Sequence, residues 1–514
     1  MDMIFNKLKV QFKADFSKQM MLLPPSLEDL IEDKNHPVFL VNSVVDRIDI
    51  EPLIKTYKGG GTTSYHPRML LKVIIYAYLN NMYSSRGIED QLKSNIHFMW
   101  LSGMSRPDHN TIFRFRSKRL KGEIKKIFSH VVALLVEEGL ISLKEAFVDG
   151  TKIEANANRY TFVWGKAIKT NKEKMKQQLD ELWAYVEQVC KQEDEAIEKP
   201  DFTELSPEKV TKTIDQINQA LKDKKVDKKI KQKLNYASKN WAPKLKEYQV
   251  KEQILDGRNS YSKTDTDATF MRMKEDHMRN GQLKPGYNFM ISTNNQFCTC
   301  YTLGQTTADS SMFIDHCNEF KELNNTLPNE ITADSGFGSE ENYQYLDEES
   351  IIPYVKFNYF HKEQSKKFKQ EWYRVENLHY NKEQDCFYCP MGQQMRKIGA
   401  KTEKTKTGFK QRITLYQAIN CNGCPIRWGC HKAQGNRTIS VNHNLTRYKN
   451  QVRKLLTSEE GIKRRKQRPW DVEGTFGILK QNKGFRRFML RGLENVEIEA
   501  GLLLIAHNIA KMSA

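Results

Sequence analysis

Three acidic residues lie far apart in this 514-residue sequence, each in a setting that suits metal binding. Asp149 ends the apolar run 146–148, Asp334 ends the run 331–333, and Glu473 lies in a basic segment near the carboxyl end. Carboxylates that converge from rigid elements can hold two Mg²⁺ ions about 3.5–4 Å apart, which activate the attacking oxygen and stabilise the leaving oxygen of a phosphodiester. The pattern therefore predicts metal-dependent phosphodiester cleavage. For any one of these acids alone, a solvated surface position is the commoner explanation.

The segment around Glu473 is predicted to be a helix with one acid facing the site. Asp471 and Glu473 are two residues apart and project in roughly opposite directions, so only Glu473 is expected to point inward. Phe476 and Lys480 share its face at helical spacing. Trp470 could stack on a displaced base, but a cover over the core is the preferred interpretation. A basic track for DNA phosphates is predicted from Arg468, Lys480, Lys483, Arg486 and Arg487.

The composition supports a polyanionic partner. Lys and Arg number 82 against 63 Asp and Glu, which gives a formal net charge of +19. Nucleic acid is the commonest partner of so basic a chain, and solubility alone is the alternative reading. No apolar run is long enough to cross a bilayer, and residues 1–19 lack the core of a signal peptide, so no membrane partner and a cytoplasmic location are expected.

The apolar patterns predict the elements that must position the three acids. A strand at 146–148 ends at Asp149, with 151–155 as a candidate hairpin partner, and strands at 287–292 and 297–303 flank a hairpin turn. A helix at 310–323, a strand at 331–333, a helix at 339–346 and a strand at 351–355 follow. The late helix carries Glu473. This is the order of an α/β ribonuclease-H-like fold, with a mixed sheet flanked by helices and two interruptions.

The remaining regions are predicted to be helical or rich in cysteine. In the first 140 residues, the segment 107–116 enters a basic helix and favours either a helix-turn-helix DNA reader or an ordinary helical bundle. Between residues 166 and 255, apolar residues repeat in steps of three and four, which predicts an inserted helical hairpin punctuated by Pro200, Pro207 and Pro243. The predicted domains are 1–140 (helical, DNA-binding), 141–164 (first part of the catalytic core), 165–255 (inserted hairpin), 256–360 (second part of the core), 361–450 (Cys-rich, zinc-ribbon-like) and 451–514 (last part of the core).

Five of the nine cysteines cluster between residues 386 and 430. Two Cys-x2-Cys pairs separated by 31 residues resemble a zinc ribbon or knuckle, in which four thiolates fold a loop too polar to build its own core. Unliganded reduced thiols are the alternative. Five cysteines for four places leave the ligand set open among Cys386, Cys389, Cys421, Cys424 and Cys430, whereas Cys190, Cys298, Cys300 and Cys317 are interpreted as small core residues.

Several motifs together resemble the DDE transposases of bacterial insertion sequences, in the IS-four-like superfamily and its IS-eleven-eighty-two branch. They span nearly the whole chain: Tyr65-His-Pro-Arg68, Pro107-Asp-His109, Asp149-Gly-Thr-Lys-Ile-Glu-Ala-Asn156, Gly286-Tyr-Asn288, Ala333-Asp334-Ser-Gly336, and Asp471-Val-Glu473 through Arg491-Gly492.

The resemblance implies a ribonuclease-H-like domain whose Asp149, Asp334 and Glu473 bind two Mg²⁺, with Mn²⁺ able to substitute. It implies cleavage at terminal inverted repeats, transfer of 3′ ends to target DNA, a homodimer that holds both ends, and a nucleoid-associated bacterial location. It further implies a structural zinc on Cys389, Cys421, Cys424 and Cys430. One departure stands out. The superfamily places Arg four residues before the last acid, where this chain has Pro469 and a neighbouring Arg468, and the place of the superfamily's Tyr holds Lys466.

Two other functions remain open on the sequence. A non-catalytic, zinc-containing DNA-binding regulator would make the three acids incidental. A ribonuclease-H-like nuclease without strand transfer would cut DNA without regard to defined element ends.

Overall fold

A mixed six-stranded sheet forms the centre of the protein. The computed structural model describes residues 26–57, 64–191, 200–222, 224, 226–273 and 281–513. The strand order is β4-β5-β1-β7-β8, and β6 also pairs with β5. β1 is antiparallel to β5 and parallel to β7, and β8 is parallel to β7. The strands are β1 (Glu145–Glu154), β4 (Thr269–Arg272), β5 (Leu283–Asn294), β6 (Phe297–Gly304), β7 (Glu330–Ala333) and β8 (Ile352–Val355).

The predicted order of strands and helices in this region is confirmed, with one correction at the first strand. β5 and β6 form the expected hairpin, and its turn residues Asn295 and Gln296 have φ of 53° and 63°, which suits a two-residue hairpin turn. Residues 151–155, by contrast, make no hairpin with 146–148. β1 runs unbroken to Glu154 because the long β5 pairs with it along eight positions, from Phe147 to Glu154.

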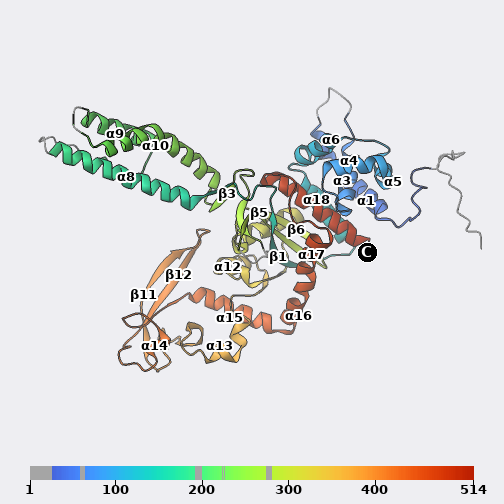
Figure 1. The fold of residues 1–514 in the computed structure, drawn as a ribbon. Coiled ribbons are helices and arrows are strands. Elements are labelled where there is room, and N and C mark those ends of the chain that lie inside the picture. The colour runs from blue at the N-terminus through green and yellow to red at the C-terminus, as the bar shows by residue number, and fades with distance from the viewer. Residues whose placement is uncertain are drawn as a thin grey trace, which may run out of the picture.

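Helices cover the sheet and join it to the amino-terminal region in one continuous core. The last helix, α18, is buried on nearly all sides from Val496 to Ile509 and packs on β6, α3 and α7 (Figure 1). Within this contact the buried Glu499 accepts a hydrogen bond from Tyr78, which also accepts one from Arg116. The helices of this part are α1 (Pro37–Arg47), α2 (Glu51–Lys55), α3 (Pro67–Leu79), α4 (Ser85–Ser94), α5 (Ile96–Ser102), α6 (His109–Arg114), η1 (Phe115–Arg119), α7 (Ile124–Glu137), η2 (Asp309–Met312), α11 (Phe313–Asn324), η3 (Ser335–Phe337), α12 (Glu340–Glu348) and α18 (Leu493–Met512).

The first insertion is a helical arm that projects from the sheet (Figure 1). Its described residues form the helices α8 (Gly165–Lys191), α9 (Pro207–Ala220) and α10 (Lys228–Leu255), which share a core of their own. Pro207 begins α9 as expected, but Pro243 lies inside α10 and does not end it. Pro200 precedes α9 in a segment without regular structure. The short strands β2 (Phe162–Trp164) and β3 (Ser260–Ser262) pair where the arm joins the rest of the protein.

The Cys-rich region forms a second lobe around an antiparallel five-stranded sheet of order β13-β12-β11-β10-β9. Its small core contains Phe387, Met395 and Tyr416. β11 and β12 extend beyond that core as a long two-stranded ribbon (Figure 1). The elements are η4 (Lys362–Gln364), α13 (Lys366–Gln370), η5 (Val375–Asn377), β9 (His379–Asn381), β10 (Cys386–Tyr388), β11 (Gln394–Lys404), β12 (Lys410–Ala418), α14 (Arg427–Cys430) and β13 (Thr438–Val441).

The chain then returns to the central sheet through an interrupted helix. α15 (His443–Thr457) and α16 (Glu459–Arg468) are followed by the π-helical turn η6 (Pro469–Glu473), the short α17 (Gly474–Gly477) and a second π-helical turn, η7 (Ile478–Asn482). A π turn bonds residue i to residue i+5 and places residues five apart on one face. The regular helix expected around Glu473 is therefore replaced by a segment with a different angular spacing.

Buried histidines should make the folded protein sensitive to acid. Burial lowers the pKa of His316 to about 3 and that of His507 to about 4. His316 lies between Ser292 Oγ at 2.7 Å and Thr302 Oγ1 at 2.9 Å. Because the unfolded imidazole titrates near pH 6.5, the unfolded chain binds more protons below that pH, and stability is lost as the pH falls toward the folded pKa. We expect each histidine to contribute a loss of roughly 1.4 kcal/mol per pH unit within its window.

Thermal unfolding between pH 7 and pH 4 measures this effect. His316→Asn is expected to unfold at a lower temperature at pH 7 but to lose less further stability on acidification than the wild-type protein. An unchanged pH slope in this variant would contradict the assignment.

Candidate functional site

The sheet topology places Asp149 and Asp334 next to each other. β1 and β7 are parallel neighbours, and Val148 pairs with Ala333, so the acids that directly follow these two residues lie at the same level of the sheet. Asp149 is buried within β1, whereas the Asp334 side chain is half-exposed at the end of β7. The first two predicted acids are therefore brought together by backbone pairing alone.

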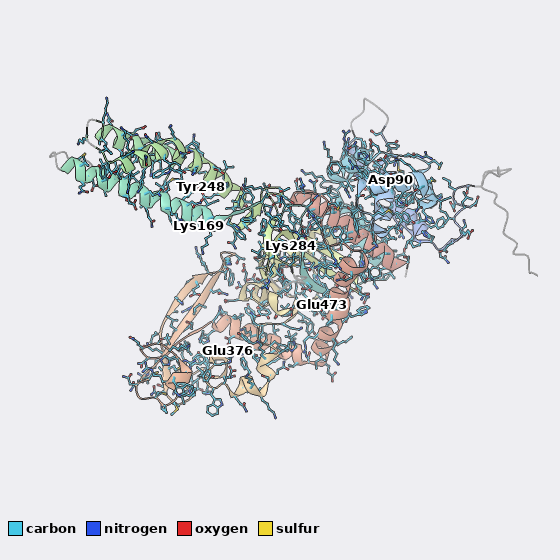
Figure 2. The ribbon with its side chains drawn as sticks, in the orientation of Figure 1. Asp90, Lys169, Tyr248, Lys284, Glu376 and Glu473 are labelled. Carbon is cyan, nitrogen blue, oxygen red and sulfur yellow. The ribbon has the colours of Figure 1, made fainter. Side chains whose placement is uncertain are left out.

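Arg468 connects the third acid to the first. Its guanidinium forms an ion pair with Asp149, with Nη2 3.2 Å from Oδ1, and donates a hydrogen bond to Glu473 Oε1 at 2.5 Å through Nη1. Arg468 and Glu473 are five residues apart, and the π turn η6 places residues at this spacing on one face of the helix. Figure 2 shows Glu473 in the helical segment between the central sheet and the lower lobe.

A second arginine one turn earlier fixes α16 against the sheet. Arg464 binds Glu145 at 2.6 Å and also binds Glu330, the first residues of β1 and β7. Arg464 and Arg468 are four residues apart and lie on the same face of the helix. The helix that carries Arg468 is therefore held at the start of β1, which contains Asp149, and of β7, which Asp334 directly follows.

Lys356 is a site residue that the sequence analysis missed. It directly follows β8, and its Nζ lies 4.0 Å from Asp334 Oδ1. Burial lowers the pKa of the Lys356 ammonium, and the nearby Asp334 carboxylate opposes that shift. The positive charge of Arg468 lowers the same pKa further, so Lys356 and Arg468 are close enough to repel each other. The available signal was its position after the parallel strand 352–355, at the same sheet edge as Asp334.

The inward-facing acid of the last segment is Asp471, which corrects the sequence analysis. Asp471 and Glu473 do project differently, but Asp471 is fully buried and Glu473 is half-exposed. The Asp471 carboxylate accepts a hydrogen bond from the backbone N–H of Gln296 at 3.0 Å and so holds the β5–β6 turn. Burial raises the pKa of the Asp471 carboxyl, and hydrogen bonds from the Thr293 side chain and the backbone of Gln296 oppose the shift. Asp471 is accordingly structural, and Glu473 is the acid that reaches Arg468.

The helix that was expected to place Glu473, Phe476 and Lys480 on one face is interrupted by two π turns, η6 and η7. Phe476 is buried in the main core and Lys480 is only 7% exposed. Trp470, expected to cover the core, is 53% exposed and lies 6.0 Å from the ammonium of Lys511.

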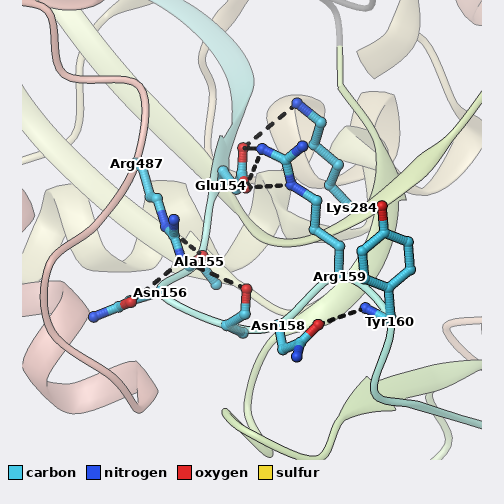
Figure 3. Close-up of polar contacts among 9 residues, drawn as sticks. Glu154, Ala155, Asn156, Asn158, Arg159, Tyr160, Lys284 and Arg487 are labelled. Carbon is cyan, nitrogen blue, oxygen red and sulfur yellow. Dashed lines mark hydrogen bonds and ion pairs between the residues drawn. The ribbon is translucent and has the colours of Figure 1, made fainter.

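The five residues of the predicted basic track have different environments. Arg468, Lys480 and Lys483 are buried, and Lys483 donates to the carbonyl of Leu79 at 3.4 Å. Arg486 and Arg487 are exposed. Arg487 donates to the carbonyl of Ala155 and to Asn156 Oδ1, and so holds the loop after β1 (Figure 3).

The same loop is fixed at its base by Glu154. Its carboxylate binds Arg159 at 3.0 Å and Lys284 at 3.5 Å (Figure 3). These contacts connect the two ends of the stretch from Asp149 to Asn156 to different parts of the protein. Its first residue lies at the candidate site, and its last residues hold the chain against the segment that follows Glu473.

Four of the five clustered cysteines surround one small pocket in the second lobe. Cys389, Cys421, Cys424 and Cys430 line it together with Arg437, whose guanidinium donates to Cys430 Sγ at 3.0 Å. Cys386 lies elsewhere, buried in β10, with its thiol donating to Gln384. The other four cysteines are buried as expected.

Within the described parts of the chain, no group of three or more His, Cys, Asp or Glu side chains is arranged to hold a metal ion. At the sheet edge, the carboxylates contact cationic side chains instead of a shared ion. Arg468 lies between Asp149 and Glu473, and Lys356 lies beside Asp334. Oxygen donors that gather around two positive charges nevertheless have the chemistry that Mg²⁺ requires. The donor set therefore fits divalent cations, but the carboxylates do not already share one ion. The cysteines likewise do not form a metal site, and the predicted zinc is not supported by their present arrangement.

The fold and the site thus define a mixed α/β protein with carboxylates gathered at one sheet edge. Residues 388–513, which include Glu473, match the family model described as a transposase DDE domain, and residues 25–118 match that described as a transposase domain (DUF772). No match was found among the curated proteins or among the solved structures. The two matches support a DDE transposase of an insertion sequence, with DNA as the implied substrate. None of the described helices is long and apolar enough to span a membrane.

Proposed function

We propose that this protein is a transposase that cuts DNA at the terminal inverted repeats of its element and joins the freed 3′ ends to target DNA. Asp149, Asp334 and Glu473 are the proposed catalytic acids. The observation that carries the proposal is their convergence: Val148 pairs with Ala333 just before the two aspartates, and Arg468 binds both Asp149 and Glu473. The transposase DDE match over the segment that contains Glu473 supports the same conclusion.

The proposed catalytic core is a ribonuclease-H-like fold. Its support is the strand order β6-β5-β1-β7-β8, with an antiparallel hairpin on one side of β1 and two parallel strands on the other. In such a core the first acid lies on the central strand and the second follows the adjacent parallel strand. The helical arm and the Cys-rich lobe are then insertions that leave this order intact.

Asp149, Asp334 and Glu473 would hold two Mg²⁺ ions, for which Mn²⁺ could substitute. The ions supply activation of the attacking oxygen and stabilisation of the leaving oxygen of the phosphodiester. The residues of the chain keep the three acids close together. Arg468 and Lys356 offset the mutual repulsion of the carboxylates, and Arg464 fixes the helix that delivers Arg468 and Glu473.

The substrate and assembly follow from this chemistry. Strand transfer requires two element ends in one complex, so we propose a homodimer that holds both ends. Of the predicted basic track, exposed Arg486 and Arg487 remain candidates for phosphate contacts, whereas buried Arg468, Lys480 and Lys483 are proposed to support the site from within. The proposed location is the bacterial nucleoid, where the DNA lies.

A structural zinc in the second lobe is a separate part of the proposal. Cys389, Cys421, Cys424 and Cys430 line one pocket, and four thiolates suit a tetrahedral Zn²⁺ at about 2.3 Å. The role is structural, because the small core of this lobe contains few apolar residues.

Metal analysis of the purified protein tests the zinc proposal. We expect zinc in the wild-type protein, its loss in Cys424→Ser, and a lower unfolding temperature for that variant. Cys386→Ser is the matched control and should retain zinc, because Cys386 lies outside the pocket. A zinc-free wild-type protein would contradict the proposal.

The transposase proposal is tested by incubating the full-length protein with duplexes that carry the DNA flanking its coding sequence, together with Mg²⁺, and mapping the cuts. Cuts confined to the element ends, followed by joining to a second duplex, are expected. Cuts spread over the duplex without joining would indicate a nuclease, and sequence-specific binding without cuts would indicate a regulator.

A further inference from the structure

The ribbon formed by β11 and β12 is strongly basic and mostly exposed. Between residues 394 and 418 it carries a single acid, Glu403. The residues of the outer half and of the turn that joins the strands are largely exposed. The cations of the ribbon are Arg396, Lys397, Lys401, Lys404, Lys406, Lys410 and Arg412.

The strand register separates these charges onto two faces. Residues directly opposite each other in an antiparallel pair project to the same side, and successive residues alternate. Lys404 pairs with Lys410, and Thr402 pairs with Arg412. These four residues form what we call the basic face. The other face of the same stretch pairs Glu403 with Gln411 and Lys401 with Ile413.

The two faces differ in net charge. On the second face Lys401 binds Glu403 at 2.6 Å, so that face carries no net charge. On the basic face, Lys404, Lys410 and Arg412 form no ion pair with any described residue, and neither does Lys406 in the turn. Three cations within two residue steps of each other, with no neutralising acid, repel one another, so an anionic partner would be favoured at this face.

The ribbon reaches from the second lobe toward α12, which lies beside the central sheet (Figure 1). At its tip, Thr407 Oγ1 donates to Glu341 Oε2 at 2.6 Å. Glu341 lies in α12, the helix that follows Asp334 and the turn η3. The tip therefore contacts the helix that follows the candidate catalytic residue Asp334. DNA bound for cleavage has to pass this edge of the sheet.

We propose that the basic face of the β11–β12 ribbon binds the phosphate backbone of double-stranded DNA on its path to the acids. This inference rests on the proposed function and adds a DNA-contacting element to it. A two-stranded ribbon has the width that a B-DNA groove admits, and Lys and Arg on one face supply contacts to phosphates rather than to base edges. The contacts are consequently expected to be independent of sequence.

Binding measured as a function of salt tests the inference. The variant is Lys404→Gln/Lys410→Gln/Arg412→Gln in the full-length protein, and the probes are one duplex carrying an element end and one of unrelated sequence. For every phosphate that the variant no longer neutralises, the slope of log K against log salt should become shallower by about 0.9. We expect the magnitude of the slope to decrease by roughly 2 to 3. The affinity for both duplexes at physiological salt should decrease on the order of 100-fold.

The matched control is Lys366→Gln/Lys367→Gln/Lys369→Gln, which removes the same charge from the exposed side of α13 in the same lobe. It should leave the slope nearly unchanged. Equal reductions in the two triple variants would overturn the inference, because total charge would then explain the effect. Wild-type affinity and slope in the ribbon variant would overturn it as well.

Single variants sharpen the assignment to one face. Lys404→Gln should weaken binding, whereas Lys401→Gln, on the opposite face of the same strand, should not. If the wild-type protein binds and cuts the element ends while the ribbon variants behave as wild type, the ribbon inference fails and the proposed function stands. If the wild-type protein neither binds nor cuts them, the proposed function itself fails.

Discussion

Asp149→Asn is expected to reduce DNA cleavage by more than about 1,000-fold while leaving DNA binding within about twofold of the wild-type value. Asparagine keeps the size of aspartate but loses the negative charge that a divalent cation requires. The side chain can still accept a hydrogen bond from Arg468, which lies 3.2 Å away in the wild-type protein, so the fold should persist. Asp334→Asn and Glu473→Gln should behave in the same way. Cleavage is measured on end-labelled duplexes with Mg²⁺, and binding by gel shift without it.

The matched control for these variants is Asp315→Asn, a change of the same type at an exposed position of α11. It should cleave at the wild-type rate. Wild-type cleavage by one of the three acid variants would remove that residue from the site. A parallel loss of binding and cleavage would indicate damage to the fold instead.

Arg468→Gln is expected to destabilise the protein by about 3 kcal/mol when divalent cations are absent. The Arg468 side chain is 4% exposed and binds two carboxylates. Its replacement leaves the buried Asp149 carboxylate without this cationic partner. The same change removes the cation that lies between Asp149 and Glu473. Added Mg²⁺ should therefore raise the unfolding temperature of Arg468→Gln by more than it raises that of the wild-type protein.

Thermal unfolding with a chelator and then with increasing Mg²⁺ measures both effects. Lys466→Gln removes the same charge from an exposed position of the same helix and should show wild-type stability and a wild-type response to Mg²⁺. An identical Mg²⁺ response in Arg468→Gln and the wild-type protein would show that Arg468 and the cation do not share the carboxylates.

The sequence predicted much of the central sheet because strands and acids there follow simple rules. The apolar runs before Asp149 and Asp334 form buried, parallel, neighbouring strands. A short apolar run that ends in a polar residue indicates such a strand from local sequence alone. The hairpin at Asn295 was equally readable from its turn residues. The order of strands and helices followed from these local patterns.

The parts that could not be predicted depend on small angular shifts or on distant partners. Two π turns interrupt the segment around Glu473, so the regular α-helical spacing assumed for Glu473, Phe476 and Lys480 does not hold there. The burial of Asp471 depends on the β5–β6 turn, which lies 175 residues away in the sequence. The site role of Lys356 required knowledge that β8 lies beside β7. The cysteine spacing indicated a shared pocket but not the side-chain geometry within it.

The deeply buried last helix has a consequence for biosynthesis. α18 packs against α3 and α7. Tyr78 of α3 donates a hydrogen bond to Glu499 of α18, which lies 421 residues later in the sequence. At translation rates of about 5–20 residues per second, the amino-terminal helices emerge from the ribosome on the order of 20 seconds or more before α18 does. During this interval the apolar surfaces of these helices lack the packing partner that α18 provides, so nascent chains are exposed to chaperones and proteases until α18 has been synthesised.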